Sequence, residues 1–178
     1  PTVIASQIIM ALQTIASRRS DPVEQVVVSI TSFETSSTAF NVIPQEVKIK
    51  GTVRTLDPDV RDLAEKEFLR ITELTAEAMG GSADAKFTRG YPVMSNSSEQ
   101  TEFAAKVARD VAGECAEAPL VMGGEDFAYM LEERPGAYIL LGNGDSSPVH
   151  HPKYNFNDDA IPFGCSWLVE LVEQKMPV

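Results

Sequence analysis

The stretch that decides the fold is Glu46-Val47-Lys48-Ile49-Lys50-Gly51-Thr52-Val53-Arg54-Thr55. Apolar Val47, Ile49 and Val53 lie on one side of this run and polar residues on the other, and a period of two predicts a β-strand with one buried face. A run rich in Val and Ile from Gln25 to Phe33 predicts another strand ahead of it. The polar, Ser/Thr-rich residues 34–40 between the two runs predict a loop.

Two helices and a further strand are predicted around this pair. Apolar residues at three- and four-residue spacing from Val3 to Ile15 predict a helix. A second helix begins after the capping residue Asp57 and ends at Gly80-Gly81, and a third strand is expected from about Asp84 to Gly90. The order α-β-β-α-β becomes the ferredoxin-like β-α-β-β-α-β unit when one strand is added in front. We therefore expect residues 1–93 to form a ferredoxin-like unit whose first strand lies upstream of Pro1.

The second half predicts helices and a single strand. Ser97 with Gln100 fits a capping box at a helix start, and a short helix is expected around residues 127–131. Residues 137–141 predict a short buried strand, and a last helix is expected from about Asp158 toward Lys175. Because one strand cannot form a sheet, residues 94–178 should complete a larger α/β domain.

The composition excludes several classes of partner. The 178 residues include 15 Lys and Arg against 26 Asp and Glu, and nucleic acids and anionic membranes would repel such a chain. No apolar stretch approaches the roughly 18 residues of a membrane helix, and no signal peptide opens the chain. With only two Cys, these features predict a cytoplasmic protein with no nucleic-acid or membrane partner.

The two histidines, His150 and His151, are adjacent, so a site that needs several histidines cannot be complete within this chain. His150 lies in a Gly- and Asn-rich loop, residues 142–157, between a predicted strand and a predicted helix. Enzymes with α/β folds place functional groups there, and imidazole is the commonest metal ligand. A histidine pair on a solvated loop is the alternative interpretation.

Two further stretches have residues suited to binding. In Met122-Gly123-Gly124-Glu125-Asp126-Phe127 the glycines permit close backbone approach and leave N–H groups free for an anion. Arg54 lies on the polar face of its strand, where its guanidinium could hold a carboxylate at two points, and Asn41 could donate to an oxyanion. The alternatives are an ordinary acidic turn, an exposed strand arginine and a turn asparagine. No Walker loop, dinucleotide fingerprint or Gly-x-Ser-x-Gly elbow is present.

Taken in order, five stretches resemble the M20 family of metal-dependent peptidases and amidohydrolases, in the branch with hippurate hydrolases and N-acyl-amino-acid amidohydrolases. They are residues 40–44, 51–55, 90–92, 122–127 and the loop around His150. The resemblance implies a zinc-peptidase-like α/β catalytic domain with two divalent metal ions (Zn, Mn, Co or Ni). It also implies a ferredoxin-like lid that dimerises. Residues 1–93 then match the lid without its first strand, and residues 94–178 match the C-terminal part of the catalytic domain.

The resemblance also implies roles for particular residues. It makes His150 a metal ligand but not His151, which stands where relatives usually have Asn or Ser. Asn41 and Arg54 match lid residues that reach the substrate, often in the partner subunit. Gly123 and Gly124 match the substrate-binding wall of the active site, and the neighbouring Glu125 and Asp126 lie behind that wall.

The remaining metal ligands, the general base and the lid histidine of such enzymes match no residue here and would lie upstream of Pro1. No catalytic residue is therefore expected in this chain, which alone should be inactive. The expected function is part of a homodimeric amidohydrolase that cleaves N-acyl amino acids of the hippurate type with a metal-activated water. The alternative is a non-catalytic ferredoxin-like module for dimerisation or ligand binding. The sequence upstream of Pro1 would distinguish the two.

Overall fold

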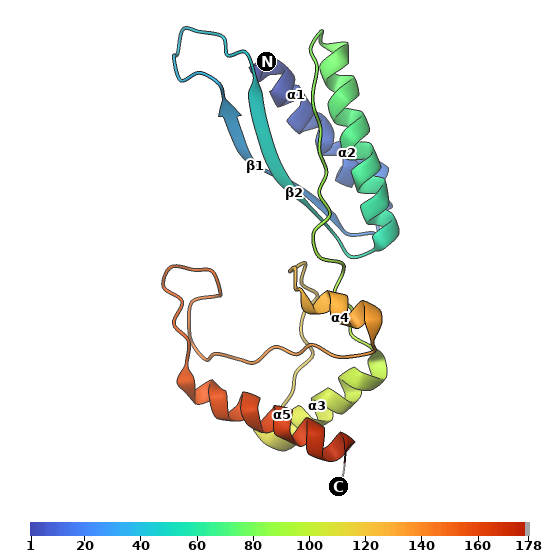
Figure 1. The fold of residues 1–178 in the computed structure, drawn as a ribbon, viewed down its shortest axis with the longest axis vertical. Helices are drawn as coiled ribbons and strands as arrows, with labels where there is room; N and C mark the ends of the chain where they lie inside the picture. Colours follow the sequence, from blue (N-terminus) through green and yellow to red (C-terminus); the bar gives the residue numbers. More distant parts are fainter. Residues whose placement is uncertain (177–178) are drawn as a thin grey trace. The chain divides into compact units, whose positions relative to one another are not determined.

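The computed structural model describes residues 1–176, which divide into two compact units (Figure 1). The first unit is Pro1–Val93 with Met122–Gly124, and the second is Met94–Val121 with the residues from Glu125 onward. Residues 177 and 178, the end of the expected second domain, lie outside the described residues. The elements in chain order are α1 (Thr2–Leu12), the π-helix η1 (Ile15–Arg19), β1 (Val26–Thr35), β2 (Val47–Thr55), α2 (Pro58–Ala78), α3 (Ser98–Ala112), α4 (Phe127–Glu133), the 3-10 helix η2 (Asp158–Ala160) and α5 (Ile161–Lys175).

The predicted strand pair is confirmed as the antiparallel hairpin β1–β2. Its register runs from Val26 opposite Thr55 to Thr35 opposite Val47, with a shift between Ile30 and Ser32 that leaves Thr31 without a partner residue. Gly51 is required at its position, because a Cβ there would collide with the carbonyl oxygen of Ser29. The register shift at Thr31 is a β-bulge in β1.

The core of the first unit lies between the hairpin and the two helices α1 and α2, which pack against each other and against the strands (Figure 1). The Asp57 carboxylate caps α2 by accepting the N–H groups of Asp59 at 2.7 Å and Val60 at 3.2 Å, as the sequence predicts. The helix gives way to Gly80, whose φ of 75° suits a residue without a side chain. The buried core residues are Ile8, Leu12, Ile15, Val28, Ala64, Ile71 and Ala76.

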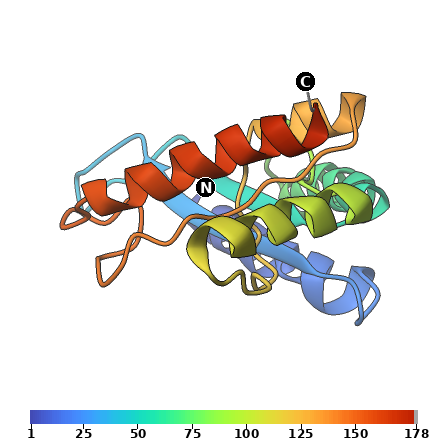
Figure 2. The ribbon, with the colours of Figure 1, turned by 90° about the horizontal axis from the view of Figure 1, so that it is seen from below.

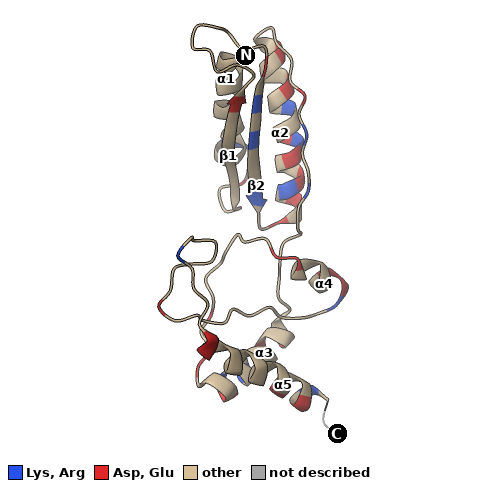
Figure 3. Cartoon of the chain, turned by 60° about the vertical axis from the view of Figure 1, so that its left-hand side comes forward, with Lys and Arg blue, Asp and Glu red and all other residues tan. Residues whose placement is uncertain are grey.

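The prediction of a strand from Asp84 to Gly90 is wrong, because β1 and β2 are the only paired strands within residues 1–176. A strand needs a hydrogen-bonding neighbour, and this segment has no backbone pairing within the described chain. Its side chains dock on α2 instead. The Phe87 ring lies edge-on to Phe68 at 5.8 Å, and Arg89 forms ion pairs with acidic residues of α2, a helix on which both charges mix (Figure 3).

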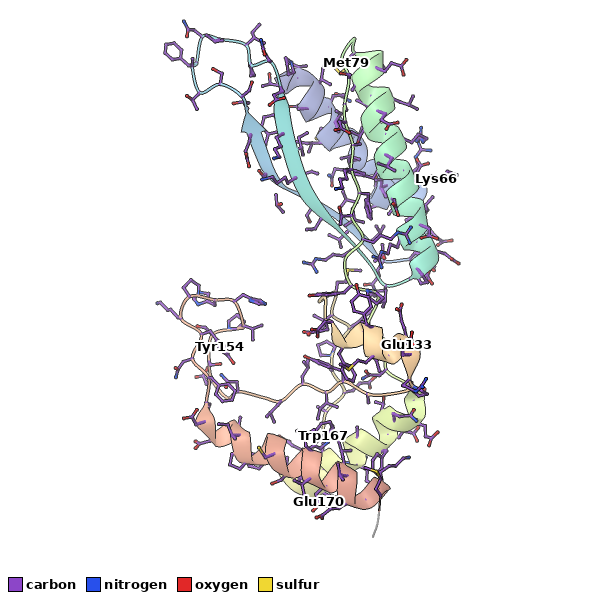
Figure 4. The ribbon with its side chains drawn as sticks, viewed as in Figure 1. Lys66, Met79, Glu133, Tyr154, Trp167 and Glu170 are labelled. Carbon is purple, nitrogen blue, oxygen red and sulfur yellow. The ribbon has the colours of Figure 1, made fainter. Side chains whose placement is uncertain are left out.

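The second unit is built on α3 and α5, which lie side by side (Figure 2). The indole N–H of Trp167 on α5 donates to the carbonyl of Ala104 on α3 at 3.1 Å (Figure 4). The predicted last helix is present, with η2 at its predicted start and α5 from Ile161. The helix α5 buries none of its residues within the described chain, and Leu168 is 59% exposed. No helix in residues 1–176 has the length and apolar character to cross a membrane.

The short strand expected at residues 137–141 is also absent from the described structure. The side-chain amide of Asn96 pairs with this segment, donating to the Tyr138 carbonyl and accepting the Tyr138 N–H, each at 2.8 Å. One amide side chain thus takes the place of a neighbouring strand. Ser97 precedes α3 as predicted but forms no side-chain cap. Its backbone N–H donates to the Gly136 carbonyl at 2.9 Å instead.

Candidate functional site

His150 lies on the exposed loop between residues 142 and 157, ahead of η2. Its φ of 69° makes it the one residue other than glycine with positive φ in the described chain. This left-handed conformation costs about 1–2 kcal/mol for a residue with a side chain, so it persists only where the surroundings impose it. Such a conformation is typical of functional positions.

The two adjacent histidines have different surroundings. The Nδ1 atom of His151 accepts the backbone N–H of Lys153 at 3.1 Å, and its backbone closes turns with Pro148 and Tyr154 (the latter labelled in Figure 4). The imidazole of His150 is exposed and has no hydrogen-bond partner within residues 1–176. His151 therefore builds the turn, and His150 is the imidazole that is free to bind.

Arg54 and the two glycines, which the sequence places far apart, come together in the first unit. The Nη1 of Arg54 donates to the carbonyl of Met122 at 2.8 Å, directly before Gly123. No atom lies within 4 Å of the point where a Cβ of Gly123 would be, so its backbone is open. At Gly124 a Cβ would lie 3.3 Å from the Tyr91 ring. Arg54 therefore holds the glycine segment in place.

The stretch 90–92 is fixed from α2. The guanidinium of Arg61 donates to the carbonyls of Gly90 at 2.9 Å and Tyr91 at 3.4 Å. Tyr91 in turn contacts the glycine segment. Residues 51–55, 90–92 and 122–124, which come from three of the stretches singled out in the sequence, thus lie together in the first unit.

Glu125 and Asp126 lie at the start of α4 and interact with Tyr138. Burial raises the pKa of the Tyr138 hydroxyl, and the charge of Glu125, its hydrogen bond with that hydroxyl and the charge of Asp126 raise it further. The Phe127 and Tyr138 rings lie 5.7 Å apart. The Tyr138 hydroxyl thus lies near the Glu125 carboxylate, and Asp126 is exposed.

Asn41 lies in the loop that joins β1 and β2, on a turn closed by the Val42 N–H and the Ala39 carbonyl at 3.3 Å. It is exposed, and no hydrogen bond joins it to another candidate residue within the part of the chain that the structure describes. Its neighbour Phe40 is fully exposed. The loop thus presents an amide and an aromatic ring to solvent.

The described residues fit one ligand of a metal site rather than a whole site. Nowhere in residues 1–176 do three His, Cys, Asp or Glu side chains converge in a way that could hold a metal ion. The imidazole of His150 is a suitable donor for Zn²⁺ and related divalent ions, but one donor does not complete a coordination shell.

Sequence reasoning missed three residues that shape the site. Asn96 holds the segment of Tyr138, the Tyr138 hydroxyl lies near Glu125, and Asn143 binds both ends of the His150 loop. The turn signal Asn143-Gly144 marks a bend, but no periodic pattern reveals bonds between residues 12 and 14 positions apart.

Known proteins of similar sequence match almost the whole chain. An N-acetyl-L-cysteine deacetylase of Bacillus subtilis is 35% identical over 176 residues, which is 99% of this chain and 42% of the relative. A hippurate hydrolase of Campylobacter jejuni is 36% identical over 177 residues, covering 96% of this chain and 45% of the relative. The chain therefore spans less than half the length of these relatives.

The structure agrees with the sequence comparisons. A solved Bacillus subtilis structure, described as a dinuclear metal binding peptidase from the M20 family, matches 99% of this chain and 46% of its own. The TM-score is 0.79 at 28% identity. The model of peptidase family M20/M25/M40 matches residues 5–174. The ordered stretches that suggested the resemblance thus agree with the comparisons, and the chain belongs to peptidase family M20/M25/M40.

Proposed function

We propose that this chain is part of a longer metal-dependent amidohydrolase that cleaves the amide bond of small N-acyl amino acids of the hippurate type. Family membership and relatives named as a deacetylase and a hippurate hydrolase support this proposal. The observation that carries it is the exposed imidazole of His150, held at a φ of 69° without a partner in the described residues.

The two units take different parts in this proposal. The first unit, with its hairpin and two helices, serves as the ferredoxin-like lid and dimerisation domain, and residues 94–178 are the C-terminal part of the catalytic domain. The chain supplies no general base, and the remaining metal ligands come from parts of the enzyme outside it. The length of the relatives, more than twice that of this chain, supports this division.

His150 is proposed as one ligand of a site for two divalent ions. The description of the Bacillus subtilis neighbour as dinuclear supports that number. When bound, such ions polarise the substrate carbonyl and lower the pKa of a water molecule. The contribution of this chain is to present an imidazole nitrogen from the loop between residues 142 and 157. His151 is excluded because its Nδ1 already accepts the N–H of Lys153.

Arg54 is proposed to bind the free carboxylate of the substrate. One of its N–H groups donates to the Met122 carbonyl, which fixes the guanidinium and leaves further donors of the fork for a carboxylate. The open backbone of Gly123 and Gly124 beside it permits a ligand to approach closely. Glu125 and Asp126, the next two residues along the chain, are proposed to have an indirect role, without contact to the substrate.

Asn41 is proposed to reach the active site of the partner subunit in a homodimer. Its loop projects an exposed amide together with Phe40 and Ile43, which is 81% exposed. An amide at that position would donate to a developing oxyanion. Exposed apolar side chains next to it are suited to an interface.

Hydrolysis of N-benzoylglycine and N-acetyl amino acids tests the proposal, measured with added Zn²⁺ or Mn²⁺. The native gene product that contains residues 1–178 should release the amino acid, whereas residues 1–178 alone should not. Hydrolysis by the isolated chain would show that its own residues complete the site. A metal-loaded gene product that cleaves no N-acyl amino acid would overturn the proposed substrate class.

A further inference from the structure

The loop that carries His150 has few ties to the rest of its unit. Residues 144–156 form neither helix nor strand, and all of them except Ser147 are exposed. Loops of this length are mobile unless specific bonds fix them. The turns around His151 order the tip of the loop, but they lie entirely within it.

The side chain of Asn143 closes the base of this loop. Its Oδ1 accepts the backbone N–H of Asn157 at 2.7 Å, and its Nδ2 donates to the Asn155 carbonyl and to the Ser146 hydroxyl, each at 2.8 Å. In the described chain, every hydrogen bond that joins 144–156 to residues outside it belongs to this amide. Three of the four hydrogen bonds that an asparagine side chain can form are therefore used here.

The residues on either side extend this closure into the fold. Gly144 has a φ of 73°, so the chain turns away immediately after Asn143. Asn157 accepts the N–H of Asp159 at 3.0 Å and thereby caps η2, which leads into α5. Asn143 thus connects the start of the loop to a helix at its end.

We propose that Asn143 is the positioning residue of the His150 loop. By joining both ends of the loop, its amide fixes where the imidazole is presented and helps to hold His150 in its left-handed conformation. Asn143 does not touch the substrate or the metal site. The inference rests on the proposed function of His150 as a ligand.

The test compares Asn143→Ala with a control, Trp167→Phe, which removes one hydrogen bond elsewhere in the same unit. Hydrogen exchange and the backbone coupling constant of His150 are measured by NMR on residues 1–178. Exchange of the Asn157 amide should become about tenfold faster in Asn143→Ala, since its acceptor is lost, and the His150 coupling should change. Both should stay at wild-type values in Trp167→Phe.

The second readout is Zn²⁺ affinity of the native gene product, measured by competition with a chelator. Removing a residue that orients a ligand weakens metal binding about tenfold or more, so Asn143→Ala should show that loss and Trp167→Phe should not. Should Asn143→Ala fail to fold, Asn143→Asp keeps the acceptor for Asn157 and loses the donor to Asn155. It should retain part of the Zn²⁺ affinity.

An unchanged exchange rate at Asn157, or an opened loop with unchanged Zn²⁺ affinity, would overturn the positioning role. A different result would contradict the proposed function. If His150→Ala in the gene product bound Zn²⁺ as tightly as the wild type, His150 would not be a ligand. The exchange rate of the Asn157 amide would still decide whether Asn143 closes the loop.

Discussion

The two units of this chain are held together in different ways. The first unit has an apolar core shared by a hairpin and two helices, whereas the second buries few residues within the described chain, and its helix α5 buries none. Side-chain hydrogen bonds of Asn96, Asn143 and Trp167 connect the segments of the second unit instead. Stability thus concentrates in the first unit, while the candidate metal ligand lies in the second.

The largest expected effect on stability is in the core of the first unit. Leu12 is 1% exposed, so Leu12→Ala should lower the free energy of unfolding by about 3–5 kcal/mol, through lost burial and the cavity that remains. Leu168→Ala on α5, the matched control, should change it by less than about 0.5 kcal/mol. Urea unfolding followed by circular dichroism measures both.

Trp167, the one tryptophan of the chain, lies in the second unit and gives a separate signal. If the units unfold independently, Leu12→Ala should leave the midpoint of its fluorescence transition unchanged. If Leu12→Ala and Leu168→Ala lowered the free energy of unfolding equally, stability would not be concentrated in the first unit.

The next effect concerns metal binding and should leave stability intact. His150→Ala in the native gene product should weaken binding at one metal position by more than the roughly 100-fold cost of losing an outer partner. Because His150 is exposed, the urea midpoint should not fall. His151→Ala is the matched control and should retain the metal. Full metal content in His150→Ala, by elemental analysis, would exclude the ligand role.

A smaller effect is expected at Arg54, the candidate substrate clamp of the first unit. Arg54→Ala should raise KM about tenfold or more for N-acyl amino acids with a free carboxylate, since a charge-assisted hydrogen bond is lost. The matching carboxamide substrate is the control. Any displacement of the Met122 segment would affect both substrates, so an equal rise in KM for both would assign Arg54 a structural role only.

The smallest effect depends on pH. Glu67 on α2 accepts hydrogen bonds from Arg70 at 2.6–3.2 Å, and these bonds hold its pKa below the ordinary value of 4.5. A carboxylate with a lowered pKa stabilises the fold above pH 4.5, and that stability is lost as the pH falls through the lowered value. Glu67→Gln should therefore lower the free energy of unfolding by about 1 kcal/mol at pH 7 and by less at pH 3.

Urea unfolding at pH 7 and pH 3 measures this difference. Glu34→Gln is the control, because hydrogen bonds from Ser32 and Lys50 also lower the pKa of that carboxylate, but it is exposed on β1. Glu34→Gln should lower the free energy of unfolding by less than Glu67→Gln does. A pH dependence of Glu67→Gln identical to that of the wild type would contradict the expectation.

The elements that the sequence predicted correctly are those with a local signal. The alternation in β2 and the cap at Asp57 each specify structure within a few residues, and both are confirmed. The strands expected at 84–90 and 137–141 are wrong because a strand also needs a partner, which no local pattern supplies. In the second case the partner is the amide of Asn96.

In the candidate site, too, the features with a local sequence signal could be predicted and those that depend on the fold could not. The type and loop context of His150 were readable from the sequence, but its left-handed backbone was not. The contact between Arg54 and Met122 joins residues 68 positions apart, and only the fold brings them together. Asn143 carried no sign of its role, since its bonds depend on where the loop returns.

The unpaired Thr31 of β1 has a consequence for the protein at high concentration. The edge of β1 that faces away from β2 has no strand beside it in the described residues, and an unbroken open edge is a template for other chains in fibrils. The bulge between Ile30 and Ser32 divides that edge into two short, twisted stretches. A foreign strand can pair along only part of it, which disfavours open-ended fibril growth.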